Sequence, residues 1–211
     1  MTINGTGDWD AWQRQCLIEV SDGTTWVSLH ALTETVDIDT GERDLDVINL
    51  LNLGQIAKHG NVGLTTVTFE GYCLQAGTGT ATGAQTGTGF WDLFAQKPAM
   101  DTADPLTNAV TTDATRFRVA ILWTRETTET VASGEVTSGY GKRFVLAECF
   151  CTACKESFTD GILKTTLTFK GAAFDNSGNA QMKLESSSGA TLVALGTYVP
   201  GTTYWAPSHP A

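Results

Sequence analysis

Apolar and polar residues alternate most regularly over residues 159–174. One face of this stretch would carry Leu163, Thr165, Leu167 and Phe169. A period of two in a segment rich in Thr and Phe is typical of a β-strand that is buried on one face and solvated on the other. The preceding Asp160-Gly161 pair is a strong signal for a tight turn, because Gly accepts a positive φ. The sequence therefore predicts an antiparallel hairpin whose first strand is residues 143–158.

The same phrase occurs earlier in the chain. Residues 65–71 have the sequence Thr-Thr-Val-Thr-Phe-Glu-Gly, and residues 165–171 have the sequence Thr-Thr-Leu-Thr-Phe-Lys-Gly. Two matching strands a hundred residues apart predict a fold with two similar halves. The alternative is a chance likeness between two Thr-rich strands.

Shorter alternations predict further strands. They lie at residues 16–20, 26–32, 62–74, 115–126, 181–186 and 191–195. An Asp22-Gly23 turn is expected to join the first two strands into a hairpin. One helix is expected over residues 90–97, where three large apolar residues follow an i, i+3, i+4 spacing before Pro98 ends the run.

These elements predict a mainly β fold. We expect two packed antiparallel sheets, sandwich- or barrel-like, with one short flanking α-helix and a long early loop. At 211 residues the chain is long enough to form a single domain with a sizeable core. Outside this core we expect an N-terminal arm at residues 1–14, a flexible Gly/Thr loop at 77–89 and an extended tail at 198–211.

The long early loop, residues 34–61, is acidic in its first half and apolar in its second. A connection of this length between strands is usually functional or disordered, and apolar side chains this dense favour burial. We therefore predict an assembly loop that folds onto a neighbouring subunit. The alternative is a short core helix or strand over residues 47–53. The candidate inter-subunit residues are Asp37, Asp39, Glu42, Asp44, Asp46, Val47, Ile48, Leu50, Leu51 and Leu53.

The chain has a formal net charge of −10. This charge disfavours a conventional nucleic-acid-binding surface, because such a surface needs Lys and Arg to displace counterions from phosphates. No apolar run reaches the roughly 18 residues of a membrane-spanning helix. The first residues lack the basic start and apolar stretch of a signal peptide, so we expect a reducing compartment.

The chain has five cysteines, an odd number, and we expect them to be free thiols. Cys149, Cys151 and Cys154 could bind a metal as thiolates, but a structural zinc site usually needs a fourth ligand and none is near in sequence. On a strand, Cys149 and Cys151 share a face, where Cys packs as a small hydrophobe. Buried thiols are the preferred interpretation.

Patterns that carry catalysis are absent from the sequence. There is no Gly-x-Ser-x-Gly elbow, and His30, His59 and His209 have no ligand-spaced neighbours. Asp37-Ile-Asp39 resembles the start of a calcium loop, but Ile48 stands where a bidentate Glu is needed. No catalytic, cofactor-binding or metal-binding residue is assigned, and the chain is not expected to be an enzyme.

A β-rich chain with one helix, a long early loop, a hairpin over residues 158–171 and the matching strand at 65–71 resembles the tail tube (major tail) proteins of long-tailed viruses of bacteria and archaea. The resemblance rests on the order of elements over most of the chain and includes no catalytic signature. It implies two crossed sheets with a helix at the side. It also implies rings, commonly hexameric, that stack into a tube, with residues 34–61 bridging stacked rings.

The resemblance further implies a structural virion protein that works in genome ejection. Its partners would be copies of itself together with tape-measure, tail-terminator and baseplate proteins, with no membrane. Viral DNA would pass without specific binding through a negatively charged lumen. The expected location is the virion tail, with assembly in the host cytoplasm. A monomeric carbohydrate-binding β-sandwich that uses Trp residues as sugar platforms, or a small hydrolase, are the alternatives.

Overall fold

The fold is known from a computed structural model. It describes residues 15–23, 26–29, 33–51, 54–72, 116–124, 131, 141–175, 177–186, 192, 195 and 198. Its strands are β1 (Gln15–Ser21), β2 (Trp26–Ser28), β3 (Thr33–Asp39), β4 (Arg43–Asn49), β5 (Gln55–Val62), β6 (Thr65–Tyr72), β7 (Phe117–Thr124), β8 (Lys142–Thr159), β9 (Ile162–Gly171) and β10 (Met182–Ser186). The prediction of a mainly β fold is confirmed.

Several predicted elements lie outside the described residues. They are the helix at 90–97, the arm at 1–14, the Gly/Thr loop at 77–89 and, apart from Tyr198, the tail. The described ranges contain no helix, and so none that is long and apolar enough to cross a membrane.

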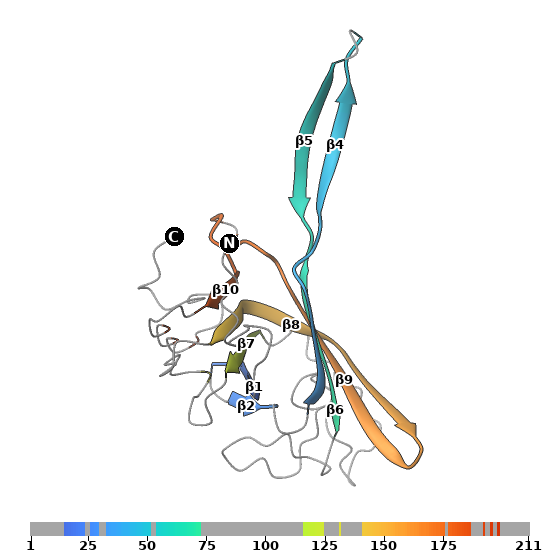
Figure 1. The fold of residues 1–211 in the computed structure, drawn as a ribbon, viewed down its shortest axis with the longest axis vertical. Helices are drawn as coiled ribbons and strands as arrows, with labels where there is room; N and C mark the ends of the chain where they lie inside the picture. Colours follow the sequence, from blue (N-terminus) through green and yellow to red (C-terminus); the bar gives the residue numbers. More distant parts are fainter. Residues whose placement is uncertain are drawn as a thin grey trace, which may run out of the picture.

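Eight strands form one continuous antiparallel sheet in the order β2-β1-β7-β8-β9-β6-β3, with β10 paired to β8 beside that path. The long strand β8 runs through two parts of this continuous sheet, which we call sheet A and sheet B (Figure 1). Its first half pairs with β7 and β10, and with β1 and β2 these strands form sheet A. Its second half pairs with β9, and with β6 and β3 these strands form sheet B. Two antiparallel sheets were expected, and here one strand belongs to both.

The register of β8 shifts where the strand passes from one sheet to the other. One irregularity lies between Phe117 and Val119 of β7, opposite β8 residues 146–149. The other lies between Cys151 and Ala153 of β8 itself. Extra residues in a ladder bend the strand and increase its twist, so these two irregularities turn β8 from sheet A into sheet B.

The main core lies where sheets A and B meet. It gathers Ile18, Val20, Leu29, Val67, Phe69, Phe117, Val119, Ile121, Phe144, Leu146, Cys149, Leu167 and Phe169. Phe169 lies at its centre, with ring centroids 5.9 Å from Phe69 and 5.8 Å from Phe117 in edge-on contacts. Strand β7 is also buried on its second face, where Ala120 and Leu122 join a smaller cluster. Its alternation alone would have left that face solvated.

The predicted hairpins around tight turns are present. Strands β1 and β2 pair across Asp22-Gly23, where Gly23 has a φ of 94°. Strands β8 and β9 pair across Asp160-Gly161, and both turn residues have positive φ values, 53° and 77°. Two positive φ values are the requirement of a type I′ turn, whose twist matches that of the strands.

The two matching strands are neighbours in one sheet, and the division of the fold into two similar halves stays a prediction. Strand β6 pairs directly with β9 in sheet B, with Thr68 opposite Thr168. Because the pairing is antiparallel, Val67 faces Phe169 and Phe69 faces Leu167. Each repeat therefore places its Phe beside the aliphatic residue of the other, and the repeat builds one strand pair.

The expected long early loop is a long connection, but most of it is strand. Its first part is β3, the outer strand of sheet B, and the rest is a β4–β5 hairpin that forms a two-stranded sheet of its own. The alternation of Leu45 and Val47 with acidic residues gives β4 a strand pattern, which the density of carboxylates obscured in the sequence. The hairpin projects from one end of the molecule (Figure 1).

Candidate functional site

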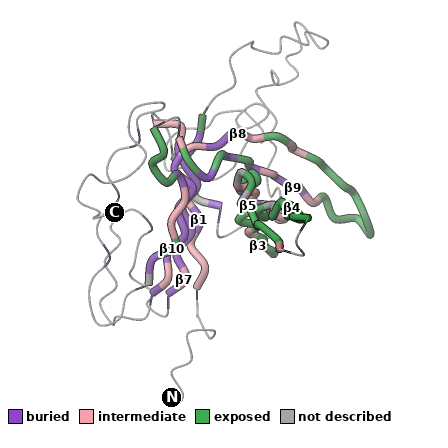
Figure 2. Tube along the Cα trace, turned by 90° about the horizontal axis from the view of Figure 1, so that it is seen from above, coloured by how far each residue is buried: buried purple, intermediate pink, exposed green. Residues whose placement is uncertain are grey.

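The β4–β5 hairpin exposes apolar side chains along its length, and Figure 2 colours both strands as exposed. The exposed aliphatic residues are Leu45, Val47, Ile48, Leu50, Leu51 and Ile56. Five of them are 43–56% exposed, and Leu51 at the turn is fully exposed. A two-stranded hairpin is at best marginally stable alone in water. The exposed aliphatic side chains of this hairpin are therefore a candidate interface.

The register of the hairpin divides these side chains between its two faces. On the first face, Val47 lies opposite Ala57, and Leu45, two residues earlier on the strand, shares that face. On the second face, Ile48 lies opposite Ile56. The second face also carries Asp46 opposite Lys58, so its apolar pair has an opposite-charge pair beside it.

Two glycines form the neck of the hairpin. Gly41 has a φ of +76°, and a Cβ at that position would lie 2.8 Å from the backbone of Gly63. The Gly63 N–H donates a 2.8 Å hydrogen bond to the Glu42 carbonyl. The Gly41 N–H donates a 2.9 Å bond to the Asp39 carboxylate. The chain therefore enters and leaves the hairpin through a close backbone crossing, at which Gly41 has no room for a side chain.

The ten predicted inter-subunit residues do not converge on one pocket. Asp37 and Asp39 lie on exposed positions of β3, and Glu42 follows them in the neck. Asp46, Val47 and Ile48 lie exposed on β4, and Leu50 and Leu51 lie exposed at the turn. The side chain of Asp44 and the whole of Leu53 lie outside the described residues. The set thus runs in a line from the edge of sheet B to the hairpin turn.

The face of sheet B turned away from the core is polar. Lys164 bridges three strands there, with Nζ 2.8 Å from Glu34 Oε2 and 3.4 Å from Glu70 Oε1. The Tyr72 hydroxyl donates a 3.0 Å hydrogen bond to Glu34. The hydrogen bond from Lys164, together with that from Tyr72, lowers the pKa of Glu34. We call this the open face of sheet B.

Sheet B has two edges without a partner strand in the described part of the chain. The outer edge of β3 is one, because β3 pairs only with β6. The other is β8 beyond Cys149, because β7 pairs with β8 only up to that residue and β9 occupies the opposite edge. Unpaired backbone groups at an edge are templates for another strand, so both edges are candidate interfaces.

The turn end of the β8–β9 hairpin is a further exposed apolar group, which sequence reasoning missed. Phe158 is 72% exposed, Ile162 is 48% exposed and Leu163 is 38% exposed. The signal for it was the adjacent apolar pair at 162–163, which breaks the alternation at the start of β9. This tip lies at the opposite end of the molecule from the β4–β5 hairpin (Figure 1).

Sheet A contains buried ion pairs that the sequence did not indicate. The fully buried Arg143 on β8 places Nη2 2.7 Å from Glu185 Oε2 on β10, and its Nε donates to the same oxygen at 2.8 Å. Between β7 and β1, Arg118 Nη2 lies 3.7 Å from Glu19 Oε1. Burial raises the pKa of Glu19, and the neighbouring Arg118 opposes that shift. Both pairs lie within the sheet and hold strands together.

The described cysteines are buried or half-buried and carry no disulfide. The Cys149 thiol donates to the Phe117 carbonyl at 3.2 Å. Burial raises the pKa of Cys16 to about 11 and that of Cys151 to about 12. Among the residues that the structure describes, no group of three or more His, Cys, Asp or Glu is placed to hold a metal ion.

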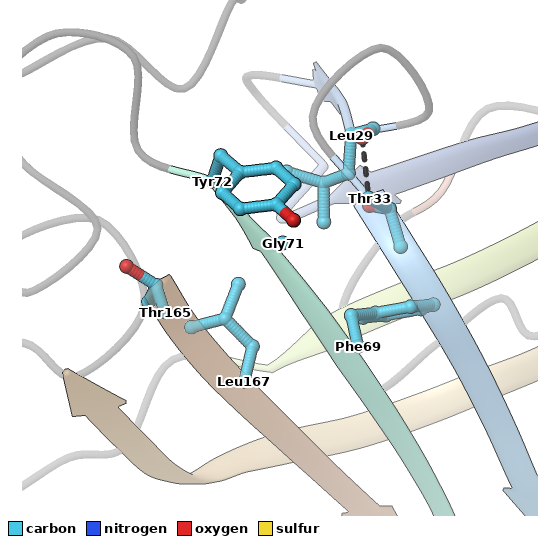
Figure 3. Close-up of a pocket in the computed structure, with 7 residues that line it drawn as sticks. All are labelled: Leu29, Thr33, Phe69, Gly71, Tyr72, Thr165 and Leu167. Atoms are coloured by element: carbon cyan, nitrogen blue, oxygen red, sulfur yellow. Dashed lines mark hydrogen bonds between the residues drawn. The ribbon is translucent and has the colours of Figure 1, made fainter. Parts of the chain in front are cut away.

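One small hollow of about 230 Å³, counted with its open mouth, lies beside the core (Figure 3). It is lined by Leu29, Thr33, Phe69, Gly71, Tyr72, Thr165 and Leu167. The Thr33 hydroxyl donates a 2.7 Å bond to the Leu29 carbonyl, and the Thr165 hydroxyl is buried without a partner. Its described lining is apolar apart from the hydroxyl groups of Thr33, Tyr72 and Thr165.

Few of the residues proposed for the alternative functions fall in the described part of the chain. Trp123 is half-buried and packs against the main core. The side chains of Trp26 and His59 and the remaining Trp and His residues lie outside the described residues.

The protein thus has a mainly β fold, in which one bent strand joins two antiparallel sheets and one hairpin forms a separate two-stranded sheet. The chain matches no protein-family model and no curated protein. Among solved structures, it is similar to a chain of the PVC sheath/tube terminator of an extracellular contractile injection system in the extended state. The TM-score is 0.50 at 11% sequence identity, over 82% of this chain and 94% of that chain.

Two other likenesses have lower scores. A chain of the PVC sheath-tube complex in the extended state gives a TM-score of 0.48 at 11% identity, over 88% of this chain and 99% of that chain. A chain of the anti-feeding prophage tube-terminating cap gives 0.42 at 10% identity, over 81% and 88%. At these identities the comparisons concern the fold, and only the likeness at a TM-score of 0.50 carries weight.

Proposed function

We propose that this protein is a structural subunit of a phage-tail-like tube, which closes into rings that stack through the β4–β5 hairpin. The observation that carries the proposal is the hairpin itself, whose aliphatic side chains stand in solvent although its backbone is well formed. The fold likeness to a sheath/tube terminator chain and the resemblance of the sequence to tail tube proteins support it. In this function the protein is not an enzyme.

Ring closure would use the two open edges of sheet B. Its four strands alternate in direction, so β3 of one copy and β8 of the next run antiparallel when the copies are related by rotation. Pairing them would extend one sheet around a ring and remove both unpaired edges. A hexamer is the ring that the resemblance implies.

Charge would favour the same contact. The open face of β3 carries Asp37 and Asp39, and the register places Lys155 on the open face of β8. An acidic edge beside a basic side chain helps to fix which strands meet. In this arrangement the acidic residues of β3 contact a neighbour in the same ring.

The hairpin would then join one ring to the next. Covering six aliphatic side chains, most of them about half-exposed, would contribute roughly 5–9 kcal/mol, taking half of the value for full burial of each. Association costs about 4–15 kcal/mol in lost rigid-body freedom. The hairpin alone therefore roughly balances the cost of association, and a stable tube needs the edge contacts as well.

The charge of the lumen depends on which face lines it. The open face of sheet B carries the carboxylates Glu34, Asp37, Asp39 and Glu70 and the cations Lys155, Lys164 and Lys170. If this face lines the channel, its charge is close to balanced, and the net charge of −10 resides mainly elsewhere. A lumen that DNA passes without binding remains a prediction, as do the tape-measure, terminator and baseplate partners, the virion tail location and cytoplasmic assembly.

Electron microscopy of the purified full-length protein tests the proposal. We expect rings or tubes at concentrations where ultracentrifugation shows large species, with a repeat that can be averaged. A protein that stays a monomer at high concentration would contradict the proposal. Binding to a glycan array by such a monomer would then favour the carbohydrate-binding alternative.

A further inference from the structure

The bend of β8 between sheets A and B has a cysteine at each of its two irregularities. Cys149 lies opposite Phe117, where the pairing of β7 with β8 shifts, and its thiol donates to the Phe117 carbonyl at 3.2 Å. Cys151 lies at the second irregularity, and its thiol donates to the Ala153 carbonyl at 3.5 Å. Because a ladder is locally disrupted at such positions, each thiol supplies a hydrogen bond where the backbone pattern is irregular.

Cys149 lies in a tightly packed part of the bend. Its side chain is fully buried in the main core, and the end of β9 passes beside it at Gly171. A Cβ at Gly171 would clash with the Glu148 carbonyl and would lie 3.2 Å from Cys149 Cβ. Protein interiors are close-packed, so atoms added to the Cys149 sulfur would have to displace its neighbours.

Cys151 borders the main core on the same strand. It is half-buried and packs against that core, and the register places it opposite Phe169. The ring of Phe169 is fully buried at the centre of the core. Side chains directly opposite each other on paired strands interact, so a group attached to the Cys151 sulfur would push against the ring around which the two sheets pack.

We propose that Cys149 and Cys151 are the sites at which a small disulfide blocks folding of the subunit, so that the chain folds only while both are thiols. In this reaction the cysteine thiolate attacks one sulfur of the disulfide. A new S–S bond joins the cysteine to half of the reagent, and the original S–S bond breaks. The released half takes up the proton that the cysteine lost and leaves as a thiol, so the cysteine is oxidised and the reagent is reduced.

The order of folding and reaction decides the outcome. In the unfolded chain both sulfurs are exposed, and an ordinary thiol forms enough thiolate to react. Once the bend has formed, burial raises the pKa of Cys151 to about 12 and holds that of Cys149 well above its usual range. The chain is thus sensitive to disulfides before it folds and protected afterwards. This inference does not rest on the proposed function, because the subunit has to fold whether or not it assembles.

Refolding of the full-length protein tests the proposal. The protein is unfolded in urea, treated with hydroxyethyl disulfide, freed of excess reagent and returned to buffer without urea, and mass spectrometry counts the modified thiols. Near- and far-UV circular dichroism measure the folded fraction. We expect treatment to lower the ratio of folded to unfolded protein about tenfold or more, as in an overpacked core. Reduction with dithiothreitol should restore it.

Two variants locate the effect. Cys149→Ser with Cys151→Ser keeps a hydroxyl donor at both positions and leaves the three other cysteines, so we expect it to refold after treatment. Cys16→Ser with Cys73→Ser and Cys154→Ser leaves only the two cysteines of the bend, and we expect treatment to block its refolding as it does in the wild-type protein.

If the treated variant that retains only the bend cysteines refolds, the bend tolerates the added group and the proposal is wrong. If the treated Cys149/Cys151 variant is blocked as strongly as the wild-type protein, other cysteines carry the effect and the proposal is equally wrong. If the Cys149/Cys151 variant does not fold even untreated, the first variant decides, since a block that dithiothreitol reverses supports the proposal and normal refolding overturns it.

Discussion

The two long hairpins of this protein are built alike and are placed in opposite surroundings. Strands β8 and β9 meet at a tight turn, and beyond the tip one face of their hairpin packs into the main core through Leu167 and Phe169. Strands β4 and β5 also meet at a short turn, but in the described part of the chain they pair with no other strand, and none of their described side chains is buried. The comparison separates two uses of one motif, because a hairpin with one buried face builds the subunit, whereas a hairpin with two exposed apolar faces is available to join subunits.

The largest difference is expected in stability. Phe169→Ala on β9 would remove a fully buried ring that contacts Phe69 and Phe117, and we expect a loss of about 3–5 kcal/mol in the free energy of unfolding. Ile48→Ala on β4 changes a half-exposed side chain and should change that free energy by about 0.5 kcal/mol or less. Urea unfolding of the unassembled protein measures both. Equal losses would mean that the β4–β5 hairpin belongs to the core of its own chain.

The neck of the hairpin gives the next effect. In Gly41→Ala, the new Cβ would meet the Gly63 backbone at 2.8 Å at a φ of +76°, so we expect a cost of about 1–3 kcal/mol together with impaired assembly. Gly161→Ala is the matched control, because it has a φ of +77° and open space around it. It should lose stability through its backbone conformation and still assemble. Normal assembly of the Gly41 variant would show that the direction of the hairpin is unimportant.

A smaller effect is expected from charges at the edges of sheet B. Lys155→Glu places a carboxylate on the β8 edge that would adjoin the acidic β3 edge of a neighbour, and Asp37→Lys reverses the other side. Exposed pairs are worth about 0.2–1 kcal/mol each, so each single variant should raise the critical concentration for assembly a few-fold, and more strongly at low salt. The double variant should recover most of the loss. If the critical concentration of the double variant instead rises by the combined effect of the two single variants, this edge contact is wrong.

The smallest effect concerns the thiols beside the core. Burial raises the pKa of Cys151 to about 12 and holds that of the fully buried Cys149 well above its usual range. The reactive thiolate is therefore scarce at neutral pH, and Cys149 and Cys151 of the native protein should react slowly with a thiol reagent, faster as the pH rises towards 9. After denaturation all five cysteines should react. A rapid reaction of Cys149 or Cys151 in the native state, located by mass spectrometry, would mean that this part of the sheet opens readily.

The sequence predicted those parts of the fold that local pattern controls. Strands with one buried face, such as β6 and β9, follow from alternation, and the turn at Asp160-Gly161 follows from residues that accept positive φ. The pairing of β6 with β9 did not follow, because alternation fixes which face a strand buries and says nothing about its neighbour. The buried Arg143–Glu185 pair was equally invisible, because the two residues are 42 positions apart.

The candidate site was predicted in part. The density of apolar residues near Ile48 indicated a segment that seeks burial, and the structure places these side chains in solvent. Its form as a hairpin was missed because the acidic residues around Leu45 resemble a loop. The apolar tip around Phe158 was missed because each of its residues is ordinary in a strand, and its exposure depends on how far the hairpin extends beyond the core.

The central claim is that the β4–β5 hairpin serves assembly and is not needed for folding of the subunit. Sedimentation velocity of the triple variant Ile48→Ser, Leu50→Ser and Leu51→Ser, with its far-UV circular dichroism recorded on the same sample, tests this claim most directly. We expect a β-rich monomer at concentrations where the wild-type protein forms tubes. An unfolded variant would make the segment ordinary core, and a variant that still polymerises would show that assembly does not depend on the hairpin.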